Sequence, residues 1–116
     1  MRWSNIVIDC RDAKSLSQWW GSALDLEVHS SDDGEYWVEP GGEIPDILFI
    51  EVPEEKTVKN RLHLDFRPRD QEAEVQRLID LGAVKVDIGQ GIVTWVVLAD
   101  PEGNEFCVLR SEPEEG

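Results

Sequence analysis

Short apolar runs alternate with two amphipathic segments along this chain, and the same order of elements occurs twice. In the first half, an apolar run at 6–10 precedes a helical pattern that begins after Asp12. In the second half, a run at 62–67 precedes a helical pattern that begins after Asp70 and ends near Gly82. Three strand candidates follow each helical pattern, at 27–29, 36–39 and 47–52 and then at 84–87, 92–98 and 105–109.

Two Arg-Asp pairs mark the starts of the two helical patterns. Arg11-Asp12 and Arg69-Asp70 lie 58 positions apart, which is half of the 116-residue chain. With the matching element order, this spacing predicts a tandem repeat of βαβββ units, the first at about 1–55 and the second at about 58–111. We therefore expect a single α+β domain. A helix covers one face of each sheet, so two joined units, from one chain or exchanged between two chains, enclose a cup formed by a curved mixed sheet.

A turn signal precedes the last strand candidate. In Asp100-Pro101-Glu102-Gly103-Asn104, the proline presets φ for a tight turn and Gly103 tolerates the positive φ that closes it. We expect the segments 95–99 and 105–109 to form a hairpin around this turn.

Charge and composition limit the partners of this chain. The formal net charge of −14 repels phosphate backbones and anionic lipids, so we expect neither nucleic acid nor membrane as a partner. No apolar run reaches the roughly 20 residues of a spanning helix, and no signal-peptide pattern opens the chain, which favours a cytoplasmic protein. In that compartment Cys10 and Cys107 are expected to stay thiols. The acidic tail at 112–116 has no apolar residue to bury and is expected to be a solvated end.

Two segments of this chain resemble motifs of a known superfamily. The turn at 100–104 is similar to an Asp-Pro-x-Gly-Asn turn, and Trp19-Trp20-Gly21-Ser22-Ala23-Leu24-Asp25-Leu26 is similar to a helix end with an aromatic pair. With the repeat, they make the chain resemble the vicinal oxygen chelate superfamily, in particular its glyoxalase-like and bleomycin-resistance-like domains. The resemblance implies paired βαβββ units, a small-molecule ligand in the cup and a homodimer.

The resemblance also points to four positions that hold a divalent ion in the metal-dependent members. Glu51 and His63 match the residues of the family. Asn5 stands where His or Gln is usual, and Cys107 stands where Glu is usual.

Strand alternation tests these positions without the family. In the run at 62–67, Leu62, Leu64 and Phe66 share one face, as expected for residues that pack on helices. His63 and Asp65 therefore face the cup.

In the run at 47–52, the same alternation predicts that Leu48 and Ile50 pack and that Glu51 faces the cup. In the last strand, Cys107 lies between two packing residues and also faces the cup.

The ligand set is incomplete for a tightly held metal. Asn is a weak neutral ligand, and the apolar neighbours of Cys107 favour a protonated thiol. We therefore expect no cofactor. The alternative is a divalent ion, zinc, nickel, manganese or iron, held by Glu51, His63 and Cys107.

Two interpretations of His63 remain open. In the first, a neutral imidazole is hydrogen-bonded to Asp65, Glu51 or the backbone. In the second, Glu51 and His63 form a catalytic acid/base pair, since a nearby carboxylate orients an imidazole and raises its pKa.

The aromatic side chains divide by element. Trp19 and Trp20 lie on the helix face that packs on a sheet, whereas Trp37 and Trp95 lie on strands that line the cup. An aromatic wall of this kind suits a flat or cationic organic ligand, and carboxylates such as Asp65 add negative potential. His29 precedes a turn-rich loop and is interpreted as a surface residue.

These observations predict a protein that binds a small organic molecule without a tightly bound metal. The expected ligand contacts are Asn5, Trp37, Asp65, Trp95 and Cys107, with Glu51 and His63 as the candidate catalytic pair. One alternative is a metal-dependent lyase, isomerase or dioxygenase that uses Glu51 and His63. The other is a dimeric interaction module with a vestigial cup.

Overall fold

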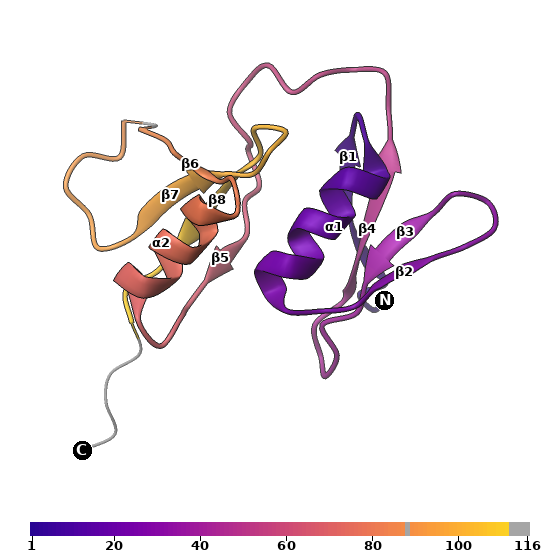
Figure 1. Ribbon diagram of the computed structural model, residues 1–116, viewed down its shortest axis with the longest axis horizontal. Coiled ribbons are helices and arrows are strands. Elements are labelled where there is room, and N and C mark those ends of the chain that lie inside the picture. Colours follow the sequence, from indigo (N-terminus) through magenta and orange to yellow (C-terminus); the bar gives the residue numbers. More distant parts are fainter. Residues whose placement is uncertain (88, 112–116) are drawn as a thin grey trace. The chain divides into compact units, whose positions relative to one another are not determined.

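The computed structural model describes residues 1–87 and 89–111, and the chain divides into two units, Met1–Glu55 and a second that begins at Lys56. Each unit contains one helix and one four-stranded sheet (Figure 1). The acidic tail expected at 112–116 lies outside the described residues. The elements of the first unit are β1 (Asn5–Cys10), α1 (Ala13–Leu24), β2 (Val28–Ser30), β3 (Tyr36–Val38) and β4 (Asp46–Glu51). Those of the second unit are β5 (Asp65–Phe66), α2 (Gln71–Asp80), β6 (Val84–Lys85), β7 (Val96–Ala99) and β8 (Glu105–Val108).

The two sheets have the same topology. The strand orders are β1-β4-β3-β2 and β5-β8-β7-β6, and in each sheet the first and last strands of the unit pair in parallel while the other pairs are antiparallel. The expected α+β fold of repeated βαβββ units is confirmed. No helix in the described part of the chain has the length and apolar character that a membrane crossing requires.

An aspartate lies immediately before each helix and caps its N-terminus, as the sequence predicts. The Asp12 carboxylate accepts a hydrogen bond from the backbone N–H of Ser15 at 3.0 Å, and Asp70 accepts one from Ala73 at 3.1 Å. Each bond satisfies an N–H that has no partner within its helix.

The helices bury their apolar stripes on one face of each sheet. On α1, Leu16 is 1% exposed and Trp20 is 2% exposed, and the helix packs on β3 and β4. Trp19, expected on the same stripe, is only half-buried and meets Trp20 edge-on, with ring centroids 5.0 Å apart. In the second unit, α2 packs on β8 and buries Val75 and Leu78.

The predicted phase of β4 is wrong. Ile47 and Phe49 are buried on the side of α1, whereas Ile50 is 41% exposed and Leu48 is half-buried. Residues 47–50 are all apolar, so no alternation in this run identifies the packed face. Glu51 consequently shares the phase of Ile47 and Phe49.

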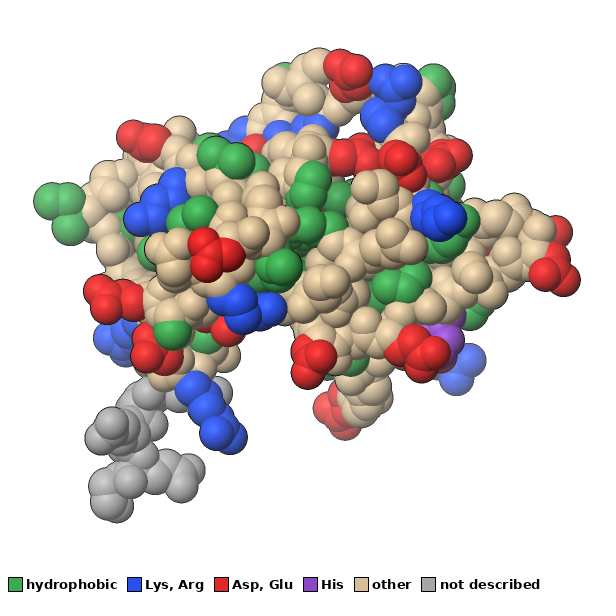
Figure 2. Space-filling view, in the orientation of Figure 1, with side chains coloured by type: hydrophobic (Ala, Val, Ile, Leu, Met, Phe, Trp, Pro, Cys, Tyr) green, Lys and Arg blue, Asp and Glu red, His purple; other side chains and the backbone are tan. Residues whose placement is uncertain are grey.

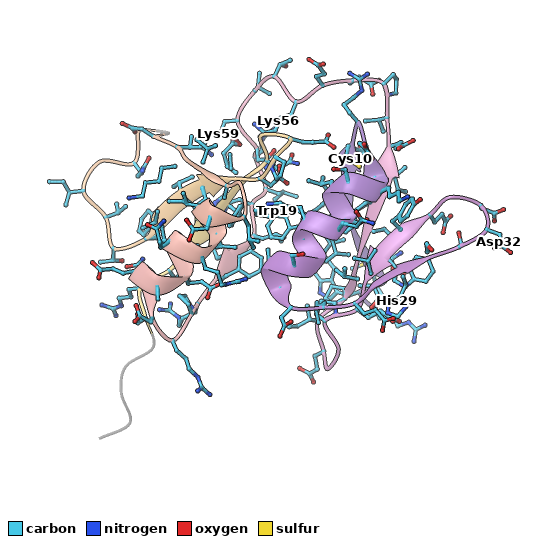
Figure 3. The ribbon with its side chains drawn as sticks, in the orientation of Figure 1. Cys10, Trp19, His29, Asp32, Lys56 and Lys59 are labelled. Carbon is cyan, nitrogen blue, oxygen red and sulfur yellow. The ribbon has the colours of Figure 1, made fainter. Side chains whose placement is uncertain are left out.

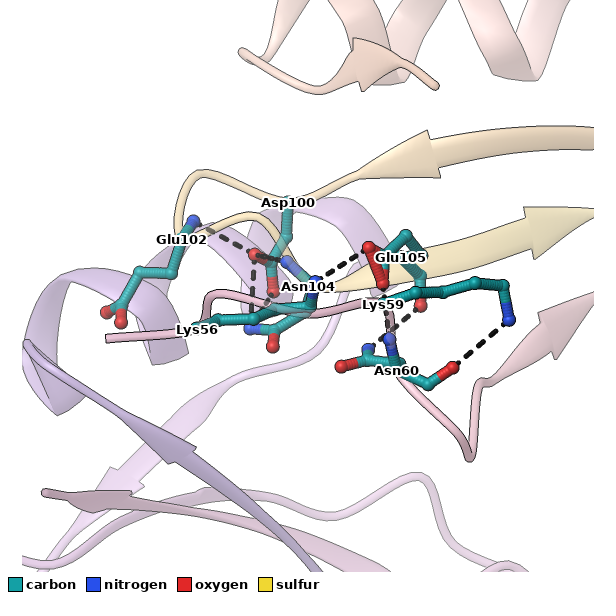
Figure 4. Close-up of polar contacts among 7 residues, drawn as sticks. All are labelled: Lys56, Lys59, Asn60, Asp100, Glu102, Asn104 and Glu105. Atoms are coloured by element: carbon teal, nitrogen blue, oxygen red, sulfur yellow. Dashed lines mark hydrogen bonds and ion pairs between the residues drawn. The ribbon is translucent and has the colours of Figure 1, made fainter. Parts of the chain in front are cut away.

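The turn before β8 is organised by one buried carboxylate. Asp100 is 3% exposed, and its Oδ1 accepts hydrogen bonds from the backbone N–H groups of Glu102 at 2.9 Å and Asn104 at 3.0 Å (Figure 4). The Asn104 side-chain amide also donates to Asp100, and Gly103 adopts a φ of 88°. The turn joins β7 and β8 in the expected antiparallel hairpin.

Substitution of Asp100 should destabilise the protein strongly. Asp100→Ala removes the acceptor of at least three hydrogen bonds in a buried turn, and we expect the free energy of unfolding to fall by about 3 kcal/mol. Chemical denaturation measures this change. Asp33→Ala, at an exposed aspartate of another turn, should shift the free energy by less than about 0.5 kcal/mol, and equal effects of the two substitutions would contradict the role assigned to Asp100.

Candidate functional site

Three titratable side chains meet on the second unit at the pairing of β5 with β8. The parallel register places Asp65 directly beside Cys107, and His63 lies two positions before Asp65. One ligand atom from each of the three lies within 4.8 Å of the others. We refer to His63, Asp65 and Cys107 as the β5–β8 cluster.

Asp65 is the central acceptor of the β5–β8 cluster. Its Oδ1 lies 2.9 Å from His63 Nδ1, and the Cys107 Sγ lies 3.9 Å from the same nitrogen. Burial is the largest cause that raises the pKa of the Cys107 thiol to about 11, and the charge of Asp65 and a hydrogen bond to it add to this effect against the weaker influence of Lys59. The thiol therefore stays protonated at neutral pH, as the sequence predicts.

The contact with Asp65 determines the tautomer of His63. A carboxylate is only an acceptor, so Nδ1 carries the hydrogen and donates it to Asp65. In a neutral imidazole the lone pair then lies on Nε2, which has no hydrogen-bond partner among the described residues. The hydrogen bond to Asp65 that the first interpretation of His63 expects is present, and the neutral state of the imidazole stays a prediction. The imidazole offers Nε2 as an acceptor on a side chain that is 39% exposed.

The geometry of the β5–β8 cluster does not suit a cysteine nucleophile. An activating histidine takes the thiol proton on one ring nitrogen while a carboxylate orients the other. Here a single nitrogen, Nδ1, faces both Asp65 and Cys107. The high pKa of Cys107 also keeps the reactive thiolate scarce.

The same three donors form a set that a borderline metal ion accepts. Imidazole nitrogen, carboxylate oxygen and thiolate sulfur are all zinc ligands. Binding through Cys107 would displace the thiol proton, and binding through Nδ1 would displace the proton that this nitrogen donates to Asp65. Metal binding at the β5–β8 cluster is therefore opposed by protons at pH 7.

Glu51 lies on the helix side of its sheet, contrary to the predicted phase. Its Oε1 accepts a hydrogen bond from the backbone N–H of Ala13 at 3.2 Å, at the first residue of α1. The carboxylate thus satisfies a backbone N–H that has no partner within α1, and its negative charge is favourable at the N-terminus of the helix. The proposed acid/base pair with His63 joins residues of different units and stays a prediction.

Asn5 and Glu51 lie at opposite ends of the β1–β4 pair. Asn5 pairs with Asp46, and Glu51 pairs with Cys10. Five residues of strand separate the two positions, about 17 Å at 3.3 Å per residue. The structure does not bring these two expected site residues together.

Trp37 is half-buried on β3, and its cross-strand partner is His29 on β2. The two rings stack with centroids 5.8 Å apart and planes 19° apart, and His29 Nε2 lies 2.7 Å from Glu39 Oε2. The sequence predicts a surface position for His29 and does not predict this contact. Only the register of β2 and β3 places His29 opposite Trp37.

Trp95 lies just before β7 and is 38% exposed.

An ion pair fastens the segment that leads into β5 to the start of β8. Lys56 Nζ lies 2.7 Å from Glu105 Oε2, and the Asn60 backbone N–H donates to Glu105 Oε1 at 2.7 Å (Figure 4). Burial alone would raise the pKa of Glu105, but the hydrogen bonds from Asn60 and Lys56 and the Lys56 charge lower it. These contacts hold the segment 56–60 against Glu105, and Glu105 lies two positions before Cys107 on β8.

Comparison with protein families gives one match over most of the chain. A family model described as "Glyoxalase-like domain" matches residues 5–109. No curated protein matches the chain.

Solved structures share the fold at low sequence identity. A glyoxalase/bleomycin resistance protein/dioxygenase family enzyme from Burkholderia phytofirmans PsJN has a TM-score of 0.73 at 19% identity, over 97% of this chain and 100% of that one. The fosfomycin resistance protein FosX from Listeria monocytogenes, a mutant complexed with Mn(II) and a dihydroxypropylphosphonic acid, has a TM-score of 0.69 at 17% identity, over 95% and 90%. TnmS3, an antibiotic binding protein from Streptomyces sp. CB03234, has a TM-score of 0.67 at 14% identity, over 97% of each chain.

Alkylation kinetics should show that Cys107 is a poor nucleophile. A thiol with a pKa of about 11 instead of 9.0 holds about 100-fold less thiolate at pH 8, so iodoacetamide should modify it at least that much more slowly than an unfolded cysteine. Asp65→Asn should lower the pKa of Cys107, because it removes a nearby negative charge, and should speed the reaction.

Peptide mass spectrometry after timed alkylation separates Cys107 from Cys10. Asp80→Asn is the matched control, since Asp80 lies on α2 and bonds Gln76, and it should leave the rate unchanged. A fast reaction of Cys107 in the wild-type protein at pH 8 would contradict the assigned protonation.

Proposed function

The chain belongs to the glyoxalase-like domain family, and from this premise we propose that it binds a small organic molecule without a tightly bound metal ion. The observation that carries the proposal is the hydrogen bond between His63 Nδ1 and Asp65 beside the buried Cys107. Asp65 accepts from His63 Nδ1, the pKa of Cys107 is raised to about 11 so that the thiol is neutral, and the cluster presents His63 Nε2 as an acceptor.

The position of His63 supports a direct contact with the ligand. Asp65 holds one ring nitrogen, so the imidazole is oriented and Nε2 is presented to a hydroxyl or amine donor. The same arrangement suits a general base, because the carboxylate stabilises the imidazolium that forms when Nε2 takes a proton. A lyase or isomerase activity of the glyoxalase-like type would use His63 in this role.

The names of two structural relatives agree with a binding function. TnmS3 is described as an antibiotic binding protein, and FosX is described as a fosfomycin resistance protein. Both descriptions concern ligands of low molecular weight. The cup between the two units, the homodimer and the cytoplasmic location expected from the sequence stay predictions.

A metal-dependent enzyme is the second candidate, because the β5–β8 cluster also supplies three donor atoms within 4.8 Å. In that case His63, Asp65 and Cys107 would hold a divalent ion, which supplies Lewis acidity when bound. Glu51 of the originally expected set belongs to the other unit and bonds the start of α1.

Ligand binding should depend on His63. In a ligand-observed NMR screen of small polar aromatic compounds, we expect hits whose Kd rises about tenfold in His63→Ala, the effect of losing one hydrogen bond. Glu72→Ala, at an exposed position on α2, is the matched control and should leave the Kd unchanged. The binding proposal fails if no compound binds, or if every hit binds His63→Ala as tightly as the wild type.

Metal content separates the two candidate functions. We expect purified protein to carry much less than one zinc or manganese ion per chain by elemental analysis, and Zn²⁺ titration at pH 7 to show only weak binding. A stoichiometric ion that is lost in both His63→Ala and Cys107→Ser would overturn the metal-free proposal and support the enzyme. An ion that stays in both variants would place the metal outside the β5–β8 cluster.

A further inference from the structure

The sheet of the first unit has one face that α1 does not cover. The registers of its strand pairs place Val7, Leu48, Trp37 and His29 in one row across this face. Val7 is 49% exposed, and the other three side chains are half-buried. The row is therefore an apolar surface that solvent reaches.

Carboxylates flank this row along the strands. Ile50 follows Leu48 on the same face and is paired with Asp9, while Asp46 precedes Leu48 and is paired with Asn5. Asp46 and Ile50 are about 13 Å apart along β4 at 3.3 Å per residue. The carboxylate of Asp46 lies at one end of this stretch, and the carboxylate of Asp9, the partner of Ile50, lies at the other. We refer to Val7, Leu48, Ile50 and Trp37 with Asp9 and Asp46 as the open face.

An aromatic wall stands at one edge of the open face. The Trp37 and His29 rings are stacked, and Glu39 holds His29 through a contact of 2.7 Å. Glu39 follows β3, and this contact shows that its carboxylate reaches the side of the sheet on which His29 and Trp37 lie. The wall therefore combines aromatic surface with negative charge.

The charge of the first unit favours a cationic occupant. Residues 1–55 contain 13 Asp and Glu against three Lys and Arg, a formal charge of −10 out of −14 for the chain. One of those three cations, Arg11, is paired with Glu55. Acidic side chains appear widely over the molecular face in Figure 2. A surface of this sign attracts cations and repels anions.

The spacing of the carboxylates on the open face does not suit a single metal ion. In the described part of the chain, the β5–β8 cluster is the one group of three or more potential ligands close enough to hold an ion. The acidic groups of the open face are spread along the strands, whereas its centre is apolar and aromatic. A flat organic cation matches both features, since its ring contacts Trp37 and the aliphatic floor while its charge lies near carboxylates.

We propose that the open face of the first unit binds a planar organic cation about 10 Å long, with Trp37 as the aromatic contact and Asp46 and Glu39 as the charged groups. This inference rests on the proposed binding of a small organic molecule and names the chemical class that the open face of the first unit accepts; His63 belongs to the other unit and is not part of this face.

Three acridines with one ring frame test the role of charge. At pH 7.5, 9-aminoacridine is a cation, acridine is neutral and acridine-9-carboxylate is an anion. By isothermal titration calorimetry at low salt, we expect 9-aminoacridine to bind about tenfold more tightly than acridine, and acridine-9-carboxylate to give no measurable heat. Raising the salt concentration should weaken the binding of the cation more than that of acridine.

Variants test the residues. Trp37→Leu should weaken 9-aminoacridine about tenfold, whereas Trp37→Phe retains an aromatic ring and should keep most of the affinity. Glu39→Gln and Asp46→Asn should each weaken it about threefold without changing the affinity for acridine. Asp32→Asn removes the same charge at the tip of the β2–β3 hairpin, away from His29 (Figure 3), and should change neither affinity. Thermal denaturation of every variant confirms that it is folded.

The outcomes distinguish this inference from the proposed function. Equal affinity for the three acridines, or an unchanged affinity in folded Trp37→Leu, overturns the inference. If His63-dependent hits from the NMR screen exist in that case, the proposed binding at His63 stands and only the site on the open face is wrong. If the cation binds as expected but no compound depends on His63, the open face is supported and the role of His63 fails.

Discussion

The parallel pairing of the first strand with the last strand in each unit is the constraint on which the site depends. It joins residues about 40 positions apart in the chain, β1 with β4 and β5 with β8, and its register decides which side chains become neighbours. In the second unit that register places Asp65 beside Cys107, and the residue two positions earlier, His63, joins them. A shift by one residue would turn these side chains to opposite faces of the sheet.

The resulting β5–β8 cluster is a hydrogen-bonded group organised around one carboxylate. Where the resemblance implies a glutamate ligand on the last strand, this chain has a buried thiol whose pKa is raised to about 11. Asp65 contributes to that high pKa and also orients His63. The cysteine thus replaces an anionic ligand with a neutral thiol, and the neighbouring aspartate engages Nδ1 of His63. The chemistry that remains suits hydrogen bonding or proton transfer at Nε2.

Much of the fold follows from local signals in the sequence. Asp12 and Asp70 begin the helices as predicted, and the Asp100 turn forms the predicted hairpin, because these features depend on residues within a few positions. The phase of β4 could not be predicted, since residues 47–50 are all apolar and pairing with β1 decides which of them are buried. His29 was missed for a related reason: its partner Trp37 is eight positions away, and only the hairpin register brings their rings together.

The tautomer of His63 reports whether Asp65 holds this imidazole. Long-range ¹H–¹⁵N correlation NMR of the imidazole, recorded above the pH at which it titrates, reports which nitrogen carries the proton. The hydrogen bond to Asp65 predicts a protonated Nδ1 and an unprotonated Nε2, with Asp65→Asn changing the Nδ1 signal. A wild-type protein with the proton on Nε2 and an unprotonated Nδ1 would show that Asp65 does not hold His63, and would leave Nδ1 available to a metal ion.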